Sequence, residues 1–338
     1  LYCTTGQGLS VFDGFKFRVI SNKRLYDNFV TTHFTDSRDV TWLGQNQNGI
    51  SFLKNDSLFA LNAPGFSDHK VVKIAEDKRY NIWVATAGGG FYKIGRDLRI
   101  TRVTGSPDYI SSFCFDKNGE ILAATSEGLK LFGPRADGSW GERHISSLLA
   151  DKNIRQVIPA NSDLQQFWVL TSDNIVYGLT LQKDGAYKVF SALGDQLGLK
   201  SDISCIYADK GDNLWIGLAE GGACQLVFRG SVIRMKYAIL RISKSNGFVL
   251  SNISSIYEDR EGNIWFGSLG DGLVQKSAEK FSFFGTSEGL TDTELKKVMA
   301  ESGKIWVGSE SGLGVYNRYT GAYSRFGAQH GFTGSHVS

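Results

Sequence analysis

The sequence has no apolar run of about 18 residues, the length that a membrane-spanning helix needs. It also has no strong charge of either sign, because 37 Lys and Arg residues nearly balance 34 Asp and Glu residues for a net charge of +3. Nucleic-acid binders concentrate Lys and Arg on one face, so the balance gives no case for nucleic acid as a partner. The chain opens at Leu1, inside a repeat, with neither an initiator Met nor a signal peptide, and we expect a fragment of a larger protein.

Residues that bind metals or act as nucleophiles are few and scattered. The four Cys residues have no CxxC spacing, and the five His residues form no HxH, HExxH or HxxxH pair. Residues 308–312 have Glu where a nucleophile elbow needs Ser, and residues 88–90 lack the Lys of a phosphate loop. We therefore interpret the Cys residues as small buried hydrophobic groups and expect no metal, no cofactor and no catalytic residue.

What the sequence does contain is a repeat, clearest at residues 258–273. An apolar strand runs into an acidic residue, a short polar turn follows, and a second strand begins at Trp265 and leads to a Gly-rich turn. The repeat anchors are five Trp residues, Trp42, Trp83, Trp215, Trp265 and Trp306, and five Asp residues, Asp36, Asp77, Asp116, Asp209 and Asp259. Four of these Asp residues lie six positions before a Trp, and Asp116 keeps the offset with Leu122 in place of Trp. We interpret the Trp residues as core between blades and the Asp residues as caps of their own turns, with Gly and Asn taking φ > 0.

The spacing of the repeat predicts the fold. Successive anchors, counting Tyr2, Leu122 and Trp168 with the Trp residues above, lie 39 to 50 residues apart, which fits four short strands with their turns. The 40 Gly and 22 Phe residues favour strands over helical repeats. We predict an all-β chain that is a single β-propeller domain over residues 1–338, with four-stranded blades and eight repeats, seven blades being the alternative. The first repeat lacks its opening strand and residues 331–338 resemble the lead into one, so we expect the N- and C-terminal segments to pair and close the ring.

Two stretches depart from the repeat. Trp168 anchors the most divergent copy, with Asp163 five rather than six positions before it. Between Trp215 and Trp265 the repeat is longest, and five basic residues occur there with no acid between them: Arg229, Arg234, Lys236, Arg241 and Lys244. This basic stretch is interpreted as a solvated outer strand, with a docking patch for a partner as the alternative.

The sequence pattern of the repeat resembles that of the two-component regulator propeller family, whose units have roughly the pattern SIxEDxxGNxWxGTxxGGL. Residues 255–268, SIYEDREGNIWFGS, are similar to it, as are residues 77–91 and 209–222. The resemblance implies an extracytoplasmic, periplasmic sensor region of a bacterial hybrid histidine kinase or one-component regulator, of the kind found in Bacteroidetes. Such regions commonly adjoin a second propeller or a β-sandwich, and many sense glycan breakdown products. The resemblance also implies that any kinase module would lie elsewhere in the parent protein, with dimerisation a further possibility there.

Propeller ligands generally sit near the axis, on the face that carries the loop after each second strand and the loop before each first strand. Carboxylates, amides and aromatic rings there suit the hydroxyl groups and C–H faces of a sugar. The candidate ligand-binding residues are Arg24, Tyr26, Asn46, Gln47, Tyr109, Glu127, Asp173, Asp202, Glu220, Asp271 and Glu310.

The sequence does not decide among three possible functions. The first is a non-catalytic sensor module that binds a small molecule or oligosaccharide and signals to a neighbouring domain. The second is a propeller enzyme, such as a lyase or glycosidase, which would need acid and base residues that break the repeat symmetry at the axis. The third is a scaffold for protein–protein interaction, and the fold does not choose among them.

Overall fold

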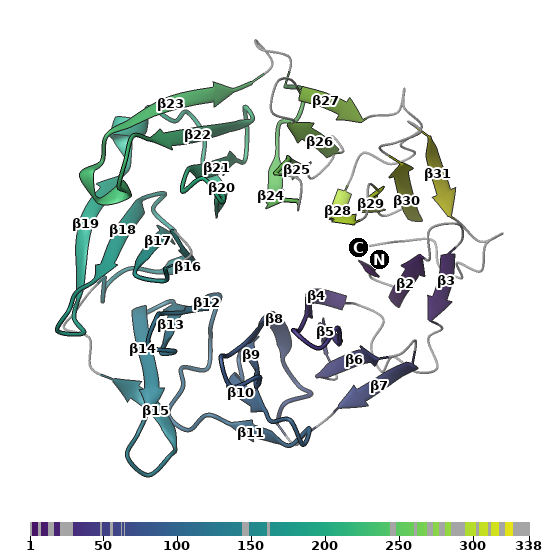
Figure 1. Cartoon of the computed structure of the whole chain (residues 1–338), viewed down its shortest axis with the longest axis vertical. Coiled ribbons are helices and arrows are strands. Elements are labelled where there is room, and N and C mark those ends of the chain that lie inside the picture. The colour runs from purple at the N-terminus through teal and green to yellow at the C-terminus, as the bar shows by residue number, and fades with distance from the viewer. Residues whose placement is uncertain are drawn as a thin grey trace.

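The computed structural model describes most of the chain, and Figure 1 shows its strands arranged as blades around a central axis. The described residues are 2–5, 8–12, 17–20, 30–47, 49–54, 57–61, 63, 65–143, 149–160, 163–243, 248–259, 262–268, 273–276, 281–284, 295–301, 304–309, 312–317 and 322–326. Within these ranges the strands form seven four-stranded sheets and one three-stranded sheet, all antiparallel. The predicted β-propeller is confirmed.

Each blade is a meander in which strands follow one another in sequence order. The strands of the first three blades are β1 (Tyr2–Thr5), β2 (Gly8–Phe12) and β3 (Phe17–Ile20); β4 (Val30–Thr35), β5 (Thr41–Gln45), β6 (Ile50–Lys54) and β7 (Ser57–Leu61); and β8 (Lys70–Glu76), β9 (Ile82–Ala87), β10 (Gly90–Ile94) and β11 (Ile100–Arg102). The next three comprise β12 (Ser112–Phe115), β13 (Ile121–Thr125), β14 (Gly128–Pro134) and β15 (Trp140–Arg143); β16 (Ile154–Pro159), β17 (Gln166–Thr171), β18 (Val176–Leu181) and β19 (Tyr187–Leu193); and β20 (Ile203–Ala208), β21 (Leu214–Leu218), β22 (Ala223–Phe228) and β23 (Tyr237–Ile242). The last two comprise β24 (Ile253–Glu258), β25 (Ile264–Ser268), β26 (Leu273–Lys276) and β27 (Phe281–Phe284); and β28 (Leu295–Glu301), β29 (Lys304–Ser309), β30 (Gly312–Asn317) and β31 (Tyr323–Phe326). Within the described ranges, two 3₁₀ turns lie in loops between strands, η2 (Asp195–Leu197) and η3 (Val232–Arg234).

The blades run around the ring in chain order, with the first strand of each four-stranded blade nearest the axis and the fourth on the outside (Figure 1). The three-stranded sheet lies between the last blade and the next, because β1 contacts β28 and β29 on one side and β4 on the other. Its three strands agree with a first repeat that lacks an opening strand. Residues 331–338, predicted to supply that strand, lie outside the described residues. None of the described elements is a helix long and apolar enough to cross a membrane.

The anchor Trp residues lie on the second strands of their blades and are almost fully buried. Trp42, Trp83, Trp215, Trp265 and Trp306 are each at most 1% exposed. The ring of Trp215 meets that of Phe266 in the next blade at 5.4 Å between centroids. Because the blades splay outward, large rings at this position fill the widening space between them. Neighbouring blades also approach closely at Gly217, where an added Cβ would lie 2.7 Å from Cγ2 of Ile253 in the next blade.

The repeated Asp residues cap their own turns, and also bind the anchor Trp. Asp209 Oδ1 accepts the backbone N–H groups of Gly211 and Asn213, each at 2.9 Å, while its Oδ2 accepts Nε1–H of Trp215 at 2.8 Å. The same Asp–Trp bond is present at Asp36–Trp42, Asp77–Trp83 and Asp259–Trp265. The residue three positions after each Asp has positive φ, and only two of the five are Gly: they are Asp39, Tyr80, Gly119, Asp212 and Gly262. The expectation that Gly or Asn takes this conformation is therefore wrong at Asp39, Tyr80 and Asp212, where hydrogen bonds to the capping carboxylate hold the turn.

The Glu that precedes the capping Asp joins neighbouring blades. Glu258 Oε2 accepts the backbone N–H of Lys210, in the turn of the preceding blade, at 2.7 Å. Glu76 binds the preceding turn in the same way, through the backbone N–H of Ser37 at 2.9 Å. The acidic pair of the repeat thus has two structural roles, one inside its blade and one between blades.

The prediction that the cysteines are buried is confirmed for two of them, and the side chain of Cys3 lies outside the described residues. Cys114 and Cys224 are buried, Cys205 is half-buried, and all three carry free thiols. Burial raises the pKa of the Cys224 and Cys205 thiols to about 11 and that of Cys114 to about 12. These thiols are therefore protonated at neutral pH.

Candidate functional site

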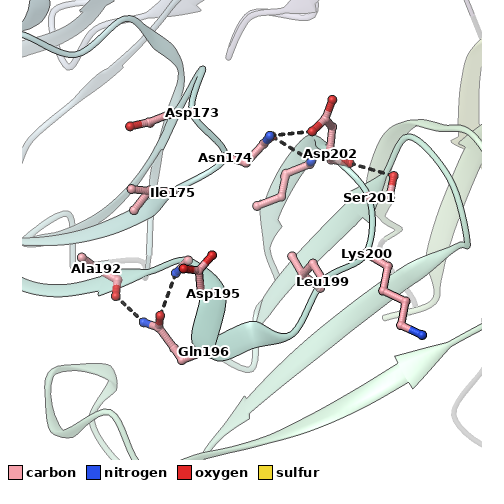
Figure 2. Close-up of a pocket in the computed structure, with 12 residues that line it drawn as sticks. Asp173, Asn174, Ile175, Ala192, Asp195, Gln196, Leu199, Lys200, Ser201 and Asp202 are labelled. Atoms are coloured by element: carbon pink, nitrogen blue, oxygen red, sulfur yellow. Dashed lines mark hydrogen bonds between the residues drawn. The ribbon is translucent and has the colours of Figure 1, made fainter.

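A polar pocket of about 600 Å³ opens between the blades β16–β19 and β20–β23, on the face predicted to carry the ligand (Figure 2). The turn between β17 and β18 supplies one wall, the end of β19 and η2 a second, and the loop before β20 the third. The polar lining residues are Asp173, Asn174, Asp195, Gln196, Lys200, Ser201 and Asp202. The pocket therefore combines carboxylates, amides, a hydroxyl and one ammonium group.

The walls of the pocket are fixed to each other by one amide side chain. Asn174 donates through Nδ2 to Asp202 Oδ1 at 2.7 Å and accepts the backbone N–H of Ile203 through Oδ1 at 3.0 Å. Its backbone is left-handed at φ 62°, a conformation that Asn tolerates better than most residues. This clamp joins two blades and orients Asp202 at the rim.

Asp173 precedes Asn174 in the turn between β17 and β18, and its carboxylate is held by a cation from the loop before β16. Lys152 Nζ donates to Asp173 Oδ2 at 2.6 Å, and the hydroxyl of Thr171 donates to Oδ1. The hydrogen bond from Lys152, followed by that from Thr171, holds the pKa of Asp173 below its ordinary value. The same hydrogen bond raises the pKa of Lys152, so both groups are charged at neutral pH.

The third wall is preformed by the turn at η2. Gln196 donates to the backbone carbonyl of Ala192 and accepts the backbone N–H of Gly194 at 3.1 Å. Ser201 Oγ accepts the backbone N–H of Glu220 at 2.8 Å. Asp195 and Lys200 are exposed, and their side chains form no hydrogen bond or ion pair with the part of the chain that the structure describes, so these side chains can contact a ligand.

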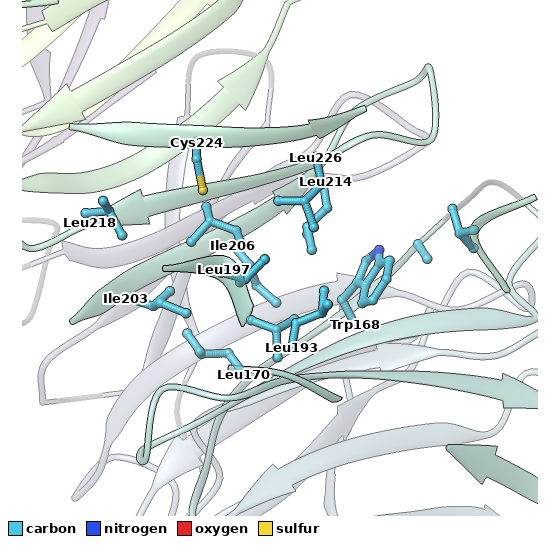
Figure 3. Close-up of a cluster of buried hydrophobic side chains, with 14 residues drawn as sticks. Trp168, Leu170, Leu193, Leu197, Ile203, Ile206, Leu214, Leu218, Cys224 and Leu226 are labelled. Atoms are coloured by element: carbon cyan, nitrogen blue, oxygen red, sulfur yellow. The ribbon is translucent and has the colours of Figure 1, made fainter. Parts of the chain in front are cut away.

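The pocket rests on the hydrophobic core between the two blades (Figure 3). Leu193, Leu197 and Ile203 belong to this core and are at most 2% exposed, which fixes the backbone that carries the polar rim. Trp168 lies in the same core, at 5.6 Å from the stacked ring of Phe228. Its Nε1–H has no acceptor among the residues that the structure describes, since Asp163 instead accepts the backbone N–H of Gln165.

The structure places the predicted ligand residues on several blades and gathers only some of them. Asp173 and Asp202 line the pocket, and Glu220 adjoins it through Ser201. Asn46, Gln47, Tyr109 and Glu127 lie on other blades, and Tyr109 is 56% exposed. Arg24, Tyr26, Asp271 and Glu310 lie outside the described residues.

Sequence reasoning missed Asn174, Asp195, Gln196, Lys200 and Ser201. For all of these except Asn174, which lies in the turn between β17 and β18, the signal was the long interval of 47 residues between Trp168 and Trp215, because the extra residues form η2 and the loop before β20. An insertion in one repeat adds structure on one face of a propeller, and it is there that repeat symmetry is broken.

The described residues also line other cavities, and two of these lie near the blades discussed above or toward the axis. One of about 550 Å³ lies at the opposite end of the same two blades, between Ile158 and Tyr207, and is mostly apolar. The other, of about 560 Å³, lies toward the axis between β4 and β24 and includes His33 and Tyr257. Within the described ranges, no three His, Cys, Asp or Glu side chains are grouped closely enough to hold a metal ion.

Comparison with known proteins identifies the repeat. Residues 247–270 match the sequence profile described as two component regulator propeller. The chain carries a two component regulator propeller repeat. The matched two component regulator propeller segment includes β24, Asp259 and Trp265, the copy in which the repeat is clearest. No curated protein matches the sequence at a significant level.

Solved structures share the propeller fold at low identity. Virginiamycin B lyase from Staphylococcus aureus is 16% identical, with a TM-score of 0.58 over 81% of this chain and 89% of that one. Sqt1 from Saccharomyces cerevisiae is 12% identical, with a TM-score of 0.62 over 84% and 81%. The extracellular domain of a protein described as a one component system of B. thetaiotaomicron is 18% identical, with a TM-score of 0.42 over 99% of this chain and 48% of that one. The chain thus spans about half the length of that domain.

Proposed function

We propose that this region is the non-catalytic, ligand-sensing propeller of a bacterial two-component signalling protein, and that its ligand is a glycan-derived oligosaccharide. The match of residues 247–270 to the two component regulator propeller profile carries the proposal. Location outside the cytoplasm follows from that role. The partners we propose are a neighbouring propeller or β-sandwich of the same protein and a second copy of the full-length protein.

The chemistry of the polar pocket supports a sugar ligand. Its amides, hydroxyl and carboxylates offer both donors and acceptors, which is what the hydroxyl groups of a sugar need. The lining includes three carboxylates, of Asp173, Asp195 and Asp202, and one ammonium group, of Lys200, while Lys152 is paired with Asp173. An excess of negative charge disfavours uronic or sulfated sugars, so we propose an uncharged oligosaccharide.

Ligand binding at this pocket would change how the two blades that form it pack together. A ligand that contacts Asp202 meets a residue whose position depends on Asn174 in the other blade. Occupancy therefore favours one arrangement of the two blades and shifts their packing against an adjacent domain. Because the walls are preformed by hydrogen bonds, the ordering cost of binding is small.

The test is calorimetry of the whole chain against matched panels of neutral and acidic oligosaccharides. We expect a neutral member to bind and Asp195→Ala and Lys200→Ala each to weaken it about tenfold, which corresponds to about 1.4 kcal/mol. Asp184→Ala, at an exposed position in the β18–β19 turn at the other end of the same blade, is the control and leaves affinity unchanged. Turnover of the bound sugar would support the lyase or glycosidase alternative. Absence of binding in the full-length protein would support the scaffold alternative.

A further inference from the structure

The outer strand β23 and the loop before it form a basic surface on the rim of the propeller. The loop joins β22 to β23 through η3, and Figure 1 shows β23 on the outside of its blade. Arg229, Arg234, Lys236 and Arg241 are all exposed. No Asp or Glu occurs in the sequence between Glu220 and Glu258, so no acid from this stretch offsets them. Lys244, the fifth basic residue of the stretch, lies outside the described residues.

Three of these cations have no partner in the part of the chain that the structure describes. Arg229, Arg234 and Lys236 take part in none of the ion pairs found there. Arg241 differs, since its Nη2 donates to the backbone carbonyl of Leu197 at 2.6 Å. Arg241 therefore holds the end of β23 in place, while the other three cations face solvent.

The edge of β23 lacks the usual protection of an outer strand. Outer strands are commonly blunted by shortness or by a central charge. The outer strands β11, β15, β27 and β31 have only three or four residues, whereas β7 has five and β19 has seven. β23 has six residues, and its only charge is Arg241, one position from its end. Leu240 is 50% exposed, and Ile233 in the preceding 3₁₀ turn is 41% exposed. A free edge, exposed apolar side chains and unpaired cations thus lie together.

We propose that this surface docks an acidic segment of a partner protein, which adds as a strand to the free edge of β23. Backbone hydrogen bonds along the edge supply affinity, as in other cases of strand addition. Carboxylates of the segment would lie against Arg229, Arg234 and Lys236, and an apolar side chain would cover Leu240. Charge complementarity selects an acidic partner over a basic one and speeds encounter. The surface gives the propeller a protein partner in addition to the ligand of the polar pocket.

The strand β23 is already held in an extended conformation before a partner binds. Ile242 is buried at the end of β23, and every residue of the strand is in register with β22, from Tyr237 opposite Phe228 to Ile242 opposite Ala223. A fixed strand loses little conformational entropy when a second strand pairs with it. The partner bears the cost of ordering, which fits an extended segment that is unstructured when free.

The first experiment measures binding of two labelled peptides to the whole chain by fluorescence anisotropy. One peptide alternates Glu with Val, and the other alternates Lys with Val. We expect the Glu peptide alone to bind and its affinity to fall as salt rises from about 0.05 to about 0.5 M. Failure of the Glu peptide to bind, or equal binding of both peptides, would overturn the proposal.

Matched charge reversals test the location. Arg234→Glu with Lys236→Glu should weaken the Glu peptide about tenfold or more. Lys183→Glu with Lys188→Glu changes the net charge equally on the β18–β19 hairpin, one blade earlier, and should leave affinity within about twofold. Equal losses in both variants would show general electrostatic attraction instead. Circular dichroism and the thermal midpoint confirm that each variant is folded.

Hydrogen exchange separates strand addition from surface attraction. Backbone amides of residues 237–242 should exchange more slowly with the Glu peptide bound, whereas those of β19 should not change. Unchanged exchange in β23 with the peptide bound would contradict the strand geometry.

Discussion

The hydroxyl of Tyr187 donates to Oδ2 of Asp116 at 2.7 Å, across 71 residues of sequence. Asp116 is the capping Asp of the blade in which Leu122 replaces the anchor Trp, so its carboxylate has no indole donor of its own. Tyr187 lies on β19 of the next blade, the blade in which Trp168 lacks the capping Asp six positions before it. A donor missing from one blade is thus supplied by its neighbour.

Tyr187→Phe should destabilise the protein by about 1–3 kcal/mol, because it leaves an oxygen of the fully buried Asp116 without its donor. Burial and the bond to Asp116 raise the pKa of Tyr187, so its hydroxyl remains a donor across the accessible pH range. Denaturant unfolding measures the change. Tyr80→Phe, at a 44% exposed position, is the control and should be near neutral. Equal effects of the two substitutions would contradict the role of the bond.

Trp168→Phe should cost about 1 kcal/mol less than Trp215→Phe, although both rings are buried. Trp215→Phe removes a bond to Asp209 along with ring volume, whereas Nε1 of Trp168 has no acceptor to lose. The free energies of unfolding of both variants, measured under one condition, give the difference. A larger loss for Trp168→Phe would show that its indole N–H is bound in solution.

The bonds to Asp36 should make stability depend on pH in the acid range. Burial acts to raise the pKa of Asp36, but hydrogen bonds from Trp42, Val40 and Arg38 outweigh it and lower that pKa below its ordinary value. Because the folded pKa is the lower one, the contribution is present above the unfolded pKa of about 3.9 and is lost as pH falls through the folded pKa.

Asp36→Asn should therefore differ most from the unsubstituted protein above about pH 4, and the gap in thermal midpoint should narrow in stronger acid. Asp39→Asn, at an exposed position of the same turn, serves as the control. A gap that does not change with pH would show that the charge of Asp36 is not what stabilises the turn.

Gly217→Ala should destabilise by about 1–3 kcal/mol, because its Cβ would meet Ile253 of the next blade and Sγ of Cys205 at 2.8 Å. Gly95→Ala is the control, since the added Cβ meets only the flexible end of Asp97. Thermal unfolding of both variants compares them. No change at Gly217 would mean that the two blades separate there at little cost.

The sequence by itself determined the architecture. An Asp and a Trp six residues apart, repeated through the chain, predict a turn and a buried second strand, since a short turn and a strand are local structures whose bonds stay within one blade. The Asp209 cap and the burial of Trp215 follow this local pattern. The same spacing predicted the face on which Asp173 and Asp202 lie.

Only the tertiary structure decided which turns meet. The clamp from Asn174 to Asp202, the bond from Tyr187 to Asp116 and the cap from Glu258 to Lys210 all join different blades. The positions of these partners depend on how blades splay and stagger around the axis, a geometry that no single repeat encodes. The polar pocket belongs to this class, because its walls come from two blades and from η2, an insertion that has no counterpart in the repeat.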